Sequence, residues 1–252
     1  MIYNNSQKKA VMHTTGPMMV LAGPGSGKTA VITGRTCQLT ASGISASRIL
    51  VVTFTRAAAK EMKERYLKAM GKTSTQVTFG TFHGVFYAIL RHTYRMSGNN
   101  ILSEEEKKRL MRELVNHYAR DLEEEDLEEN LAREISTVKN NQIPLEHYYS
   151  ACMPQEKFRE IYEAYEKWRK ENKKLDFDDL MVQCKRLFLE RPEVLRAWQQ
   201  KFQYILIDEF QDISPAQYEI VRMLALPENN LFIVGDDDQS IISSAGPSRR
   251  SC

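Results

Sequence analysis

The chain has 252 residues, of which 27% are charged and 42% hydrophobic, and its formal net charge is +2. This length allows one large or two small domains, and the composition is that of a globular protein rather than a disordered or fibrous one. The small net charge excludes a global basic field, so any nucleic-acid site must be local.

The distribution of cysteines and the N-terminal sequence bear on the cellular compartment of the protein. The four cysteines are scattered without a Cys-x-x-Cys pair, which argues against a zinc site or a disulfide framework and suits a reducing compartment. The N-terminus lacks the charged-then-apolar pattern of a secretion signal, and no apolar run approaches the length of a membrane span. We therefore expect a cytoplasmic protein with no membrane partner.

Short apolar runs alternate with helical patterns along much of the chain. Apolar runs that predict buried parallel strands occupy residues 18–22, 49–54, 77–79, 204–207 and 231–234. Helical patterns over residues 29–40 and 57–69 separate the first three runs. The alternation predicts an α/β fold with a parallel sheet and ligands at the carboxyl ends of its strands.

A glycine-rich loop follows the first predicted strand. It reads Ala22-Gly23-Pro24-Gly25-Ser26-Gly27-Lys28-Thr29, and a helical pattern follows it. Strand, loop and helix in this order are typical of a phosphate-binding loop, whose backbone N–H groups bind an anionic polyphosphate. Lys28 is expected to reach the β- and γ-phosphates, and the Thr29 hydroxyl is expected to hold Mg²⁺. The alternative is a chance glycine-rich turn, which the flanking strand and helix disfavour.

Acidic residues follow the last two predicted strands. Asp208 and Glu209 come directly after residues 204–207; Asp208 suits a Mg²⁺ ligand, and Glu209 suits a base for an attacking water. The strand at 231–234 leads into Gly235, three aspartates and Gln239, whose amide is suited to sense a γ-phosphate or to orient water. For this second stretch an acidic turn is the alternative interpretation.

Polar and aromatic residues follow the second and third predicted strands. One group is Thr53-Phe54-Thr55, and the other is Thr81-Phe82-His83. Threonine can bind backbone phosphates and phenylalanine can stack on a base of single-stranded nucleic acid. The alternative is that Phe54, Phe79 and Phe82 are core residues and that the threonines cap helices. Spacing alone does not decide between these interpretations.

Residues 98–174 are helical in pattern and dense in charge. Ser103 opens a capping box, and a helix at 158–169 carries Ile161, Tyr165 and Trp168 at core spacing. The acidic run at 121–126 is interpreted as a solvated helical face. We expect a helical insert at 98–174 within an α/β domain formed by 1–97 and 175–243.

Together these motifs resemble the N-terminal half of UvrD/Rep-type superfamily 1 DNA helicases. The resemblance implies a RecA-like P-loop NTPase fold that binds ATP and Mg²⁺, with Gln7 reading the adenine and residues 22–29 holding the phosphates. It implies Mg²⁺ binding by Asp208, water activation by Glu209, and a link between γ-phosphate and DNA through Gln239. Ala30 departs from the pattern, because relatives often place Arg or Lys there.

The same resemblance implies DNA as the partner. Thr53, Phe54, Thr55, Thr81 and His83 match residues that touch single-stranded DNA, and residues 175–180 match a further family block. The insert corresponds to subdomain 1B. The implied activity is ATP-driven 3′ to 5′ translocation and unwinding at junctions of single- and double-stranded DNA, with DNA repair among the expected processes and protein partners undetermined.

The last residues, 244–252, do not resemble the family. They read Ser-Ala-Gly-Pro-Ser-Arg-Arg-Ser-Cys, which a one-base deletion produces from codons for a family-like Phe-Arg-Gly-Ala continuation. We therefore expect an aberrant, frameshifted tail, with a genuine short tail as the alternative. Three functions stay open at this point: a helicase motor, a non-catalytic ATP- and DNA-binding fragment, and an inert product.

Overall fold

The computed structural model describes residues 3–23, 25–122, 126–141 and 143–236. The chain divides into two compact units, the first running up to Val85 and resuming at Phe188, the second from Phe86 to Leu187. Pro24, Gln239 and the 244–252 tail lie outside the described residues. Among the described helices, none is long and apolar enough to cross a membrane.

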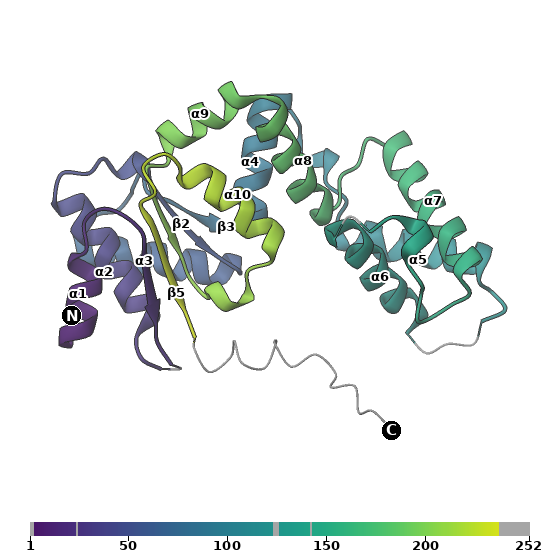
Figure 1. Ribbon diagram of the computed structural model, residues 1–252, viewed down its shortest axis with the longest axis horizontal. Coiled ribbons are helices and arrows are strands. Elements are labelled where there is room, and N and C mark those ends of the chain that lie inside the picture. The colour runs from purple at the N-terminus through teal and green to yellow at the C-terminus, as the bar shows by residue number, and fades with distance from the viewer. Residues whose placement is uncertain (1–2, 24, 123–125, 142, 237–252) are drawn as a thin grey trace. The chain divides into compact units, whose positions relative to one another are not determined.

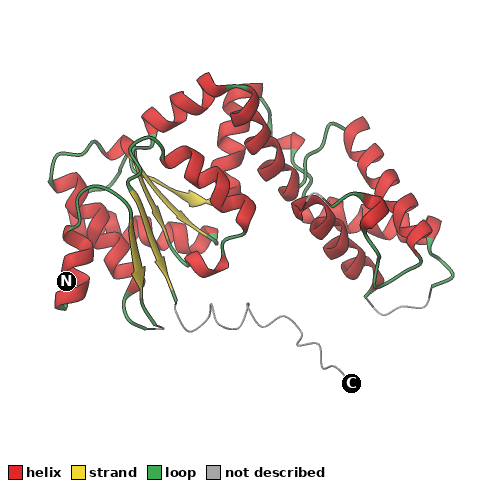
Figure 2. Cartoon of the chain, viewed as in Figure 1, coloured by secondary structure: helices red, strands yellow, loops and turns green. Residues whose placement is uncertain are grey.

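A five-stranded parallel sheet forms the centre of the first unit (Figure 2). Its strands are β1 (Met18–Leu21), β2 (Ile49–Thr53), β3 (Thr78–Thr81), β4 (Tyr204–Ile207) and β5 (Leu231–Gly235), in the order β1-β5-β4-β2-β3. All five predicted strands are present, and the α/β fold class is confirmed. Because the strands are parallel, the ends of β1, β4 and β5 lie at one edge, where the glycine-rich loop and the acidic residues follow them.

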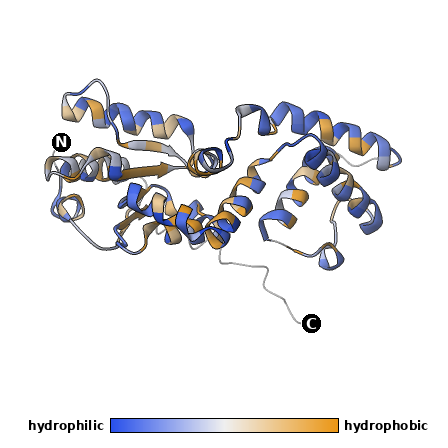
Figure 3. Cartoon of the chain, turned by 90° about the horizontal axis from the view of Figure 1, so that it is seen from above, coloured by the Kyte–Doolittle hydropathy of each residue, from blue (hydrophilic) through white to orange (hydrophobic). Residues whose placement is uncertain are grey.

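Helices cover both faces of this sheet. They are α1 (Asn5–Met12), α2 (Lys28–Ala41), α3 (Arg56–Met70), α9 (Pro192–Lys201) and α10 (Pro215–Ala225). Alternate strand residues such as Val51, Leu206 and Phe232 pack against α1, α2 and α3, and α10 lies on the opposite face (Figure 1). Figure 3 shows the apolar strands between helices whose outer faces are polar, as expected for a doubly covered parallel sheet.

The second unit is helical throughout its described secondary structure, apart from one isolated bridge. It contains α5 (Glu104–Tyr118), α6 (Leu127–Asn141) and α7 (Gln155–Glu171), while α4 (Phe82–Tyr94) and α8 (Phe177–Glu190) cross the division between the units. Ile161 and Tyr165 are buried in its core and Trp168 packs against that core. The predicted capping box is confirmed, since Ser103 and Glu106 exchange hydrogen bonds of 3.0 and 3.2 Å. The unit contains the predicted 98–174 insert and extends beyond it at both ends.

Candidate functional site

The glycine-rich loop connects the end of β1 to the start of α2. The Ala22 N–H donates to the Gly235 carbonyl at 3.0 Å, which extends the pairing of β1 with β5. Gly25 and Gly27 have φ angles of +72° and +87°, a left-handed conformation that glycine adopts without steric cost. Gly27 caps α2, so Lys28 and Thr29 stand in its first turn, where free backbone N–H groups favour an anion.

Lys28 lies between two carboxylates from neighbouring strand ends. Its Nζ is 3.0 Å from Glu209 Oε2 and 3.3 Å from Asp236 Oδ2. Burial lowers the pKa of Lys28, but hydrogen bonds and charge interactions with Glu209 and Asp236 outweigh it, so the net pKa is raised. Lys28 therefore stays charged, and its ammonium group is aimed at the ends of β4 and β5.

Gln211 joins the two carboxylate-bearing segments. Its Nε2 donates to Glu209 Oε2 at 2.7 Å, and its Oε1 accepts from the Asp236 backbone N–H at 2.9 Å. Glu209 itself has a left-handed backbone with φ of +51°, a strained conformation that turns the chain sharply after β4. Neither Gln211 nor Asp236 had a role predicted from the sequence, although both stand within the acidic stretches after β4 and β5.

Asp208 is buried and incompletely bonded. The residue is 4% exposed, and its Oδ1 atom has no hydrogen-bond partner among the described residues. Burial raises the pKa of Asp208 to about 6, and the charge of Glu209 adds to this effect, while a backbone hydrogen bond and Lys28 oppose it. A carboxylate in this condition is stabilised by a cation, which would supply the missing partner.

These residues line a single cavity of about 540 Å³. The predicted site residues in its wall are Gly25, Lys28, Thr29, Thr53, Phe54, Thr55, Asp208 and Glu209, and Asp236 and Gln211 join them. The residues present fit Mg²⁺, because the ion commonly takes one or two protein oxygens and completes its shell with phosphates and water. The described residues contain no cluster of three or more His, Cys, Asp or Glu side chains suited to a metal.

The predicted nucleic-acid residues take part in local packing and capping. Thr55 Oγ1 accepts from the Ala58 N–H and Thr81 Oγ1 from the Gly84 N–H, both at 3.1 Å, so each caps a helix. Phe82 is a core residue at 2% exposure, and the Phe54 ring packs edge-on against it at 5.3 Å while also lining the cavity. His83 is half-buried in the first turn of α4. Contact of these residues with DNA stays a prediction.

Gln7 stands beside the glycine-rich loop. Its Nε2 donates to the Ser26 carbonyl at 2.8 Å, and its Oε1 accepts from the Asn4 N–H at 3.0 Å. The start of α1 is thereby tied to the loop, and a base-reading role for Gln7 stays a prediction.

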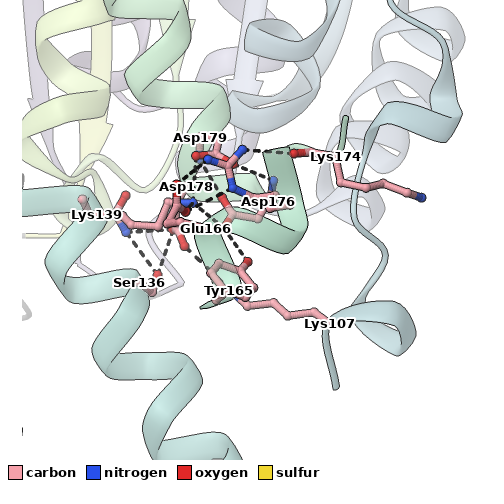
Figure 4. Close-up of polar contacts among 11 residues, drawn as sticks. Lys107, Ser136, Lys139, Tyr165, Glu166, Lys174, Asp176, Asp178 and Asp179 are labelled. Atoms are coloured by element: carbon pink, nitrogen blue, oxygen red, sulfur yellow. Dashed lines mark hydrogen bonds and ion pairs between the residues drawn. The ribbon is translucent and has the colours of Figure 1, made fainter. Parts of the chain in front are cut away.

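A second group of buried charges lies in the helical unit (Figure 4). Lys139 Nζ is 2.6 Å from Asp176 Oδ2 and 2.7 Å from Asp179 Oδ1, and Arg169 Nη1 is 2.8 Å from Asp179 Oδ2. Tyr165 donates to Asp176 at 2.7 Å, and Glu166 pairs with both cations. The family block at 175–180 therefore fastens the start of α8 to α6 and α7 within this unit.

The pKa values of the two aspartates in this group are shifted in opposite directions. Burial raises the pKa of Asp176, but Lys139 and the Tyr165 hydroxyl outweigh it, so the net pKa is lowered. The pKa of Asp179 is raised, by burial first and by the charge of Asp176 second.

Comparison with known proteins agrees with this arrangement. The model of the UvrD/REP helicase N-terminal domain matches residues 3–244. The chain is 42% identical over 250 residues to "Putative ATP-dependent DNA helicase YjcD" of Bacillus subtilis, covering 96% of this chain and 33% of the relative. It is 37% identical to the ATP-dependent DNA helicase PcrA of Leuconostoc citreum and 35% identical to that of Staphylococcus aureus, with 96% of this chain covered in both. The chain thus spans about a third of the length of these relatives. From the matched domain and these relatives, the chain belongs to the UvrD/REP helicase family.

Proposed function

We propose that this chain is the ATP-binding part of a DNA helicase motor. It binds Mg-ATP at the carboxyl ends of β1, β4 and β5 and single-stranded DNA along the ends of β2 and β3. The observation that carries the proposal is the cavity in which Lys28, Thr29, Asp208 and Glu209 converge from separate segments of the chain.

Each residue has a separate task in nucleotide hydrolysis. Lys28 exchanges its carboxylate partners for the β- and γ-phosphates, and the loop N–H groups bind the remaining phosphate oxygens. Thr29 and Asp208 would hold Mg²⁺, which neutralises phosphate charge when bound. Glu209, oriented by Gln211, accepts the proton of the attacking water. Gln239 links the γ-phosphate to the DNA site, and Gln7 reads the adenine.

DNA is the proposed macromolecular partner. Phe54, half-buried at the cavity wall, offers a ring face to a base, and Thr53, Thr55, Thr81 and His83 lie around the same strand ends. The relatives are named as DNA helicases, which supports DNA as the partner. The resemblance of the sequence motifs is the basis on which we propose 3′ to 5′ translocation at junctions of single- and double-stranded DNA, in the cytoplasm and in processes such as repair.

Two titrations test the proposal. A fluorescent ATP analogue with Mg²⁺ should bind the wild type, and Lys28→Ala should weaken that binding about 10- to 150-fold, because a hydrogen bond to a charged group is lost. Phe54→Ala should leave ATP binding unchanged and weaken binding of single-stranded DNA by ~1–3 kcal/mol. Equal loss of ATP binding in both variants would contradict the base-stacking role of Phe54.

Steady-state ATPase activity with single-stranded DNA separates a motor from a non-catalytic binding module. Turnover stimulated by DNA and abolished in Glu209→Gln supports the motor. Binding of both ligands without turnover supports the module.

A further inference from the structure

Helices α1 and α2 approach each other closely at Gly34. A Cβ atom placed on Gly34 would lie 2.1 Å from the Tyr3 hydroxyl oxygen and 3.2 Å from Val11 Cγ2. Any side chain at this position would therefore displace the hydroxyl end of the Tyr3 ring, which also donates to the Ala30 carbonyl at 3.4 Å. Glycine destabilises the interior of a helix. At this position in α2, however, the absence of a side chain leaves the space that the Tyr3 ring occupies.

The amide of Gln7 is held in a single orientation. Its Oε1 accepts from a backbone N–H, that of Asn4, and its Nε2 donates to a backbone carbonyl, that of Ser26. A flipped amide would place N–H against N–H and oxygen against oxygen at both partners. Each end of the amide keeps one further bond to make, an N–H on Nε2 and a lone pair on Oε1.

This orientation distinguishes adenine from guanine. The outer edge of adenine presents N7 as an acceptor and the N6 amino group as a donor, which match the remaining N–H and lone pair of Gln7. Guanine presents two acceptors, N7 and O6, on the same edge, so O6 would face the Oε1 lone pair. A freely flipping glutamine could not make this distinction as strongly.

We propose that Tyr3 is a positioning residue for base selection. Seated against Gly34, it fixes α1 on α2, and α1 in turn holds Gln7 between Asn4 and Ser26 in the orientation that prefers adenine. Tyr3 makes no contact with nucleotide itself. This inference rests on the proposed binding of ATP at the glycine-rich loop.

Nucleotide titrations by calorimetry, with Mg²⁺, test the inference. The ligands are ATP, GTP and inorganic tripolyphosphate, and the proteins are wild type, Tyr3→Ala, Tyr3→Phe and Gly34→Ala. Tyr3→Ala and Gly34→Ala should weaken ATP binding about tenfold and bring the ATP-to-GTP affinity ratio close to one. Tripolyphosphate affinity should stay within about twofold, since the loop is untouched, and Tyr3→Phe should behave as wild type because the ring keeps its place.

Two further variants serve as controls. Gly98→Ala adds a methyl group where nothing lies within 4 Å and should leave every affinity unchanged. In a Gln7→Ala background, Tyr3→Ala should have no additional effect on the ATP-to-GTP ratio, because both act through the same amide.

The outcomes separate this inference from the proposed function. If the wild type binds neither ATP nor tripolyphosphate, the proposed function fails. If the wild type prefers ATP and Tyr3→Ala keeps that preference, the positioning role is wrong. If Tyr3→Ala loses ATP and tripolyphosphate equally, Tyr3 supports the fold alone and the inference is overturned.

Discussion

Each compact unit buries a group of charges, and the two groups differ in how their carboxylates are satisfied. In the helical unit, Asp176 and Asp179 each contact Lys139, and further bonds from Tyr165 and Arg169 complete the set. In the α/β unit, Asp208 is equally buried but its Oδ1 has no partner among the described residues. We call the first group closed, because its carboxylates are paired. We call the second group open, because Asp208 can still accept a bond from a ligand.

The difference separates a structural use of buried charge from a functional one. A closed group fixes the relative positions of the segments that supply it, here α6, α7 and the start of α8. An open group lowers stability until a ligand completes it, and perturbed carboxylates of this kind gather at functional sites. Substituting one charge in each group should therefore change stability in opposite directions.

Lys139→Met should produce the largest effect. It leaves Glu166, Asp176 and Asp179 with Arg169 as the remaining cation of the group, and removing one member of a buried ion pair costs about 3–5 kcal/mol. The chain has two tryptophans, of which Trp168 lies in the helical unit. Urea unfolding in a Trp198→Phe background lets Trp168 report on that unit by itself.

Lys108→Met is the matched control for this substitution. Lys108 pairs with Glu129 at 4.0 Å on the surface of the same helical unit, so its loss should cost less than about 1 kcal/mol. A cost for Lys139→Met that is as small as the control's would mean that the buried group does not fasten the helices.

Asp208→Asn should stabilise the folded chain at neutral pH. The folded pKa of about 6 lies above the ordinary 3.8, so the folded state binds the proton more tightly than the unfolded state does. Wild-type stability should therefore fall as pH rises from about 4 to 6, by up to roughly 3 kcal/mol for a shift of about two units. The variant lacks this loss and should be the more stable protein above pH 6.

Unfolding midpoints of both proteins between pH 4 and 8 check this expectation. The two curves should converge near pH 4, where Asp208 is neutral. Asp212→Asn, on an exposed residue of the same cavity, is the control and should follow the wild type. A gap that is constant with pH would show that the Asp208 charge is not the cause.

Gln211→Ala should have a smaller effect on stability. It removes the bonds to Glu209 and to the Asp236 N–H, each worth about 0.5–1.5 kcal/mol, so a loss of roughly 1–3 kcal/mol is expected. Gln38→Ala, which removes one side-chain bond to Ser42, is the comparison. Thermal unfolding of both variants measures the difference, and equal losses would argue against a bridging role for Gln211.

The fold was largely predictable because apolar runs and glycine-rich loops can be recognised from short stretches of sequence. The strands at 18–22 and 204–207 and the loop between Ala22 and Thr29 followed from short stretches of sequence. The bridge from Gln211 to Asp236 was not predictable, since it depends on β4 and β5 being neighbours, which no local pattern specifies. The same holds for Tyr3 against Gly34, where the glycine signal has meaning only once α1 lies on α2.

For two aromatic residues, the sequence pattern was compatible with two different interpretations. The spacing of Phe54 and Phe82 allowed either core packing or base stacking. The structure buries Phe82 and leaves Phe54 at the cavity wall, a distinction set by tertiary packing rather than by residue type.

The binding of ATP with and without Mg²⁺, measured by calorimetry on the wild type and on Asp208→Asn, tests the central claim most directly. If the open group at Asp208 completes its coordination with Mg²⁺ beside a nucleotide held by Lys28, Mg²⁺ should tighten ATP binding to the wild type about tenfold. Asp208→Asn should bind ATP with little response to Mg²⁺. A wild type that does not bind ATP, or a variant that keeps the full Mg²⁺ effect, would contradict the account.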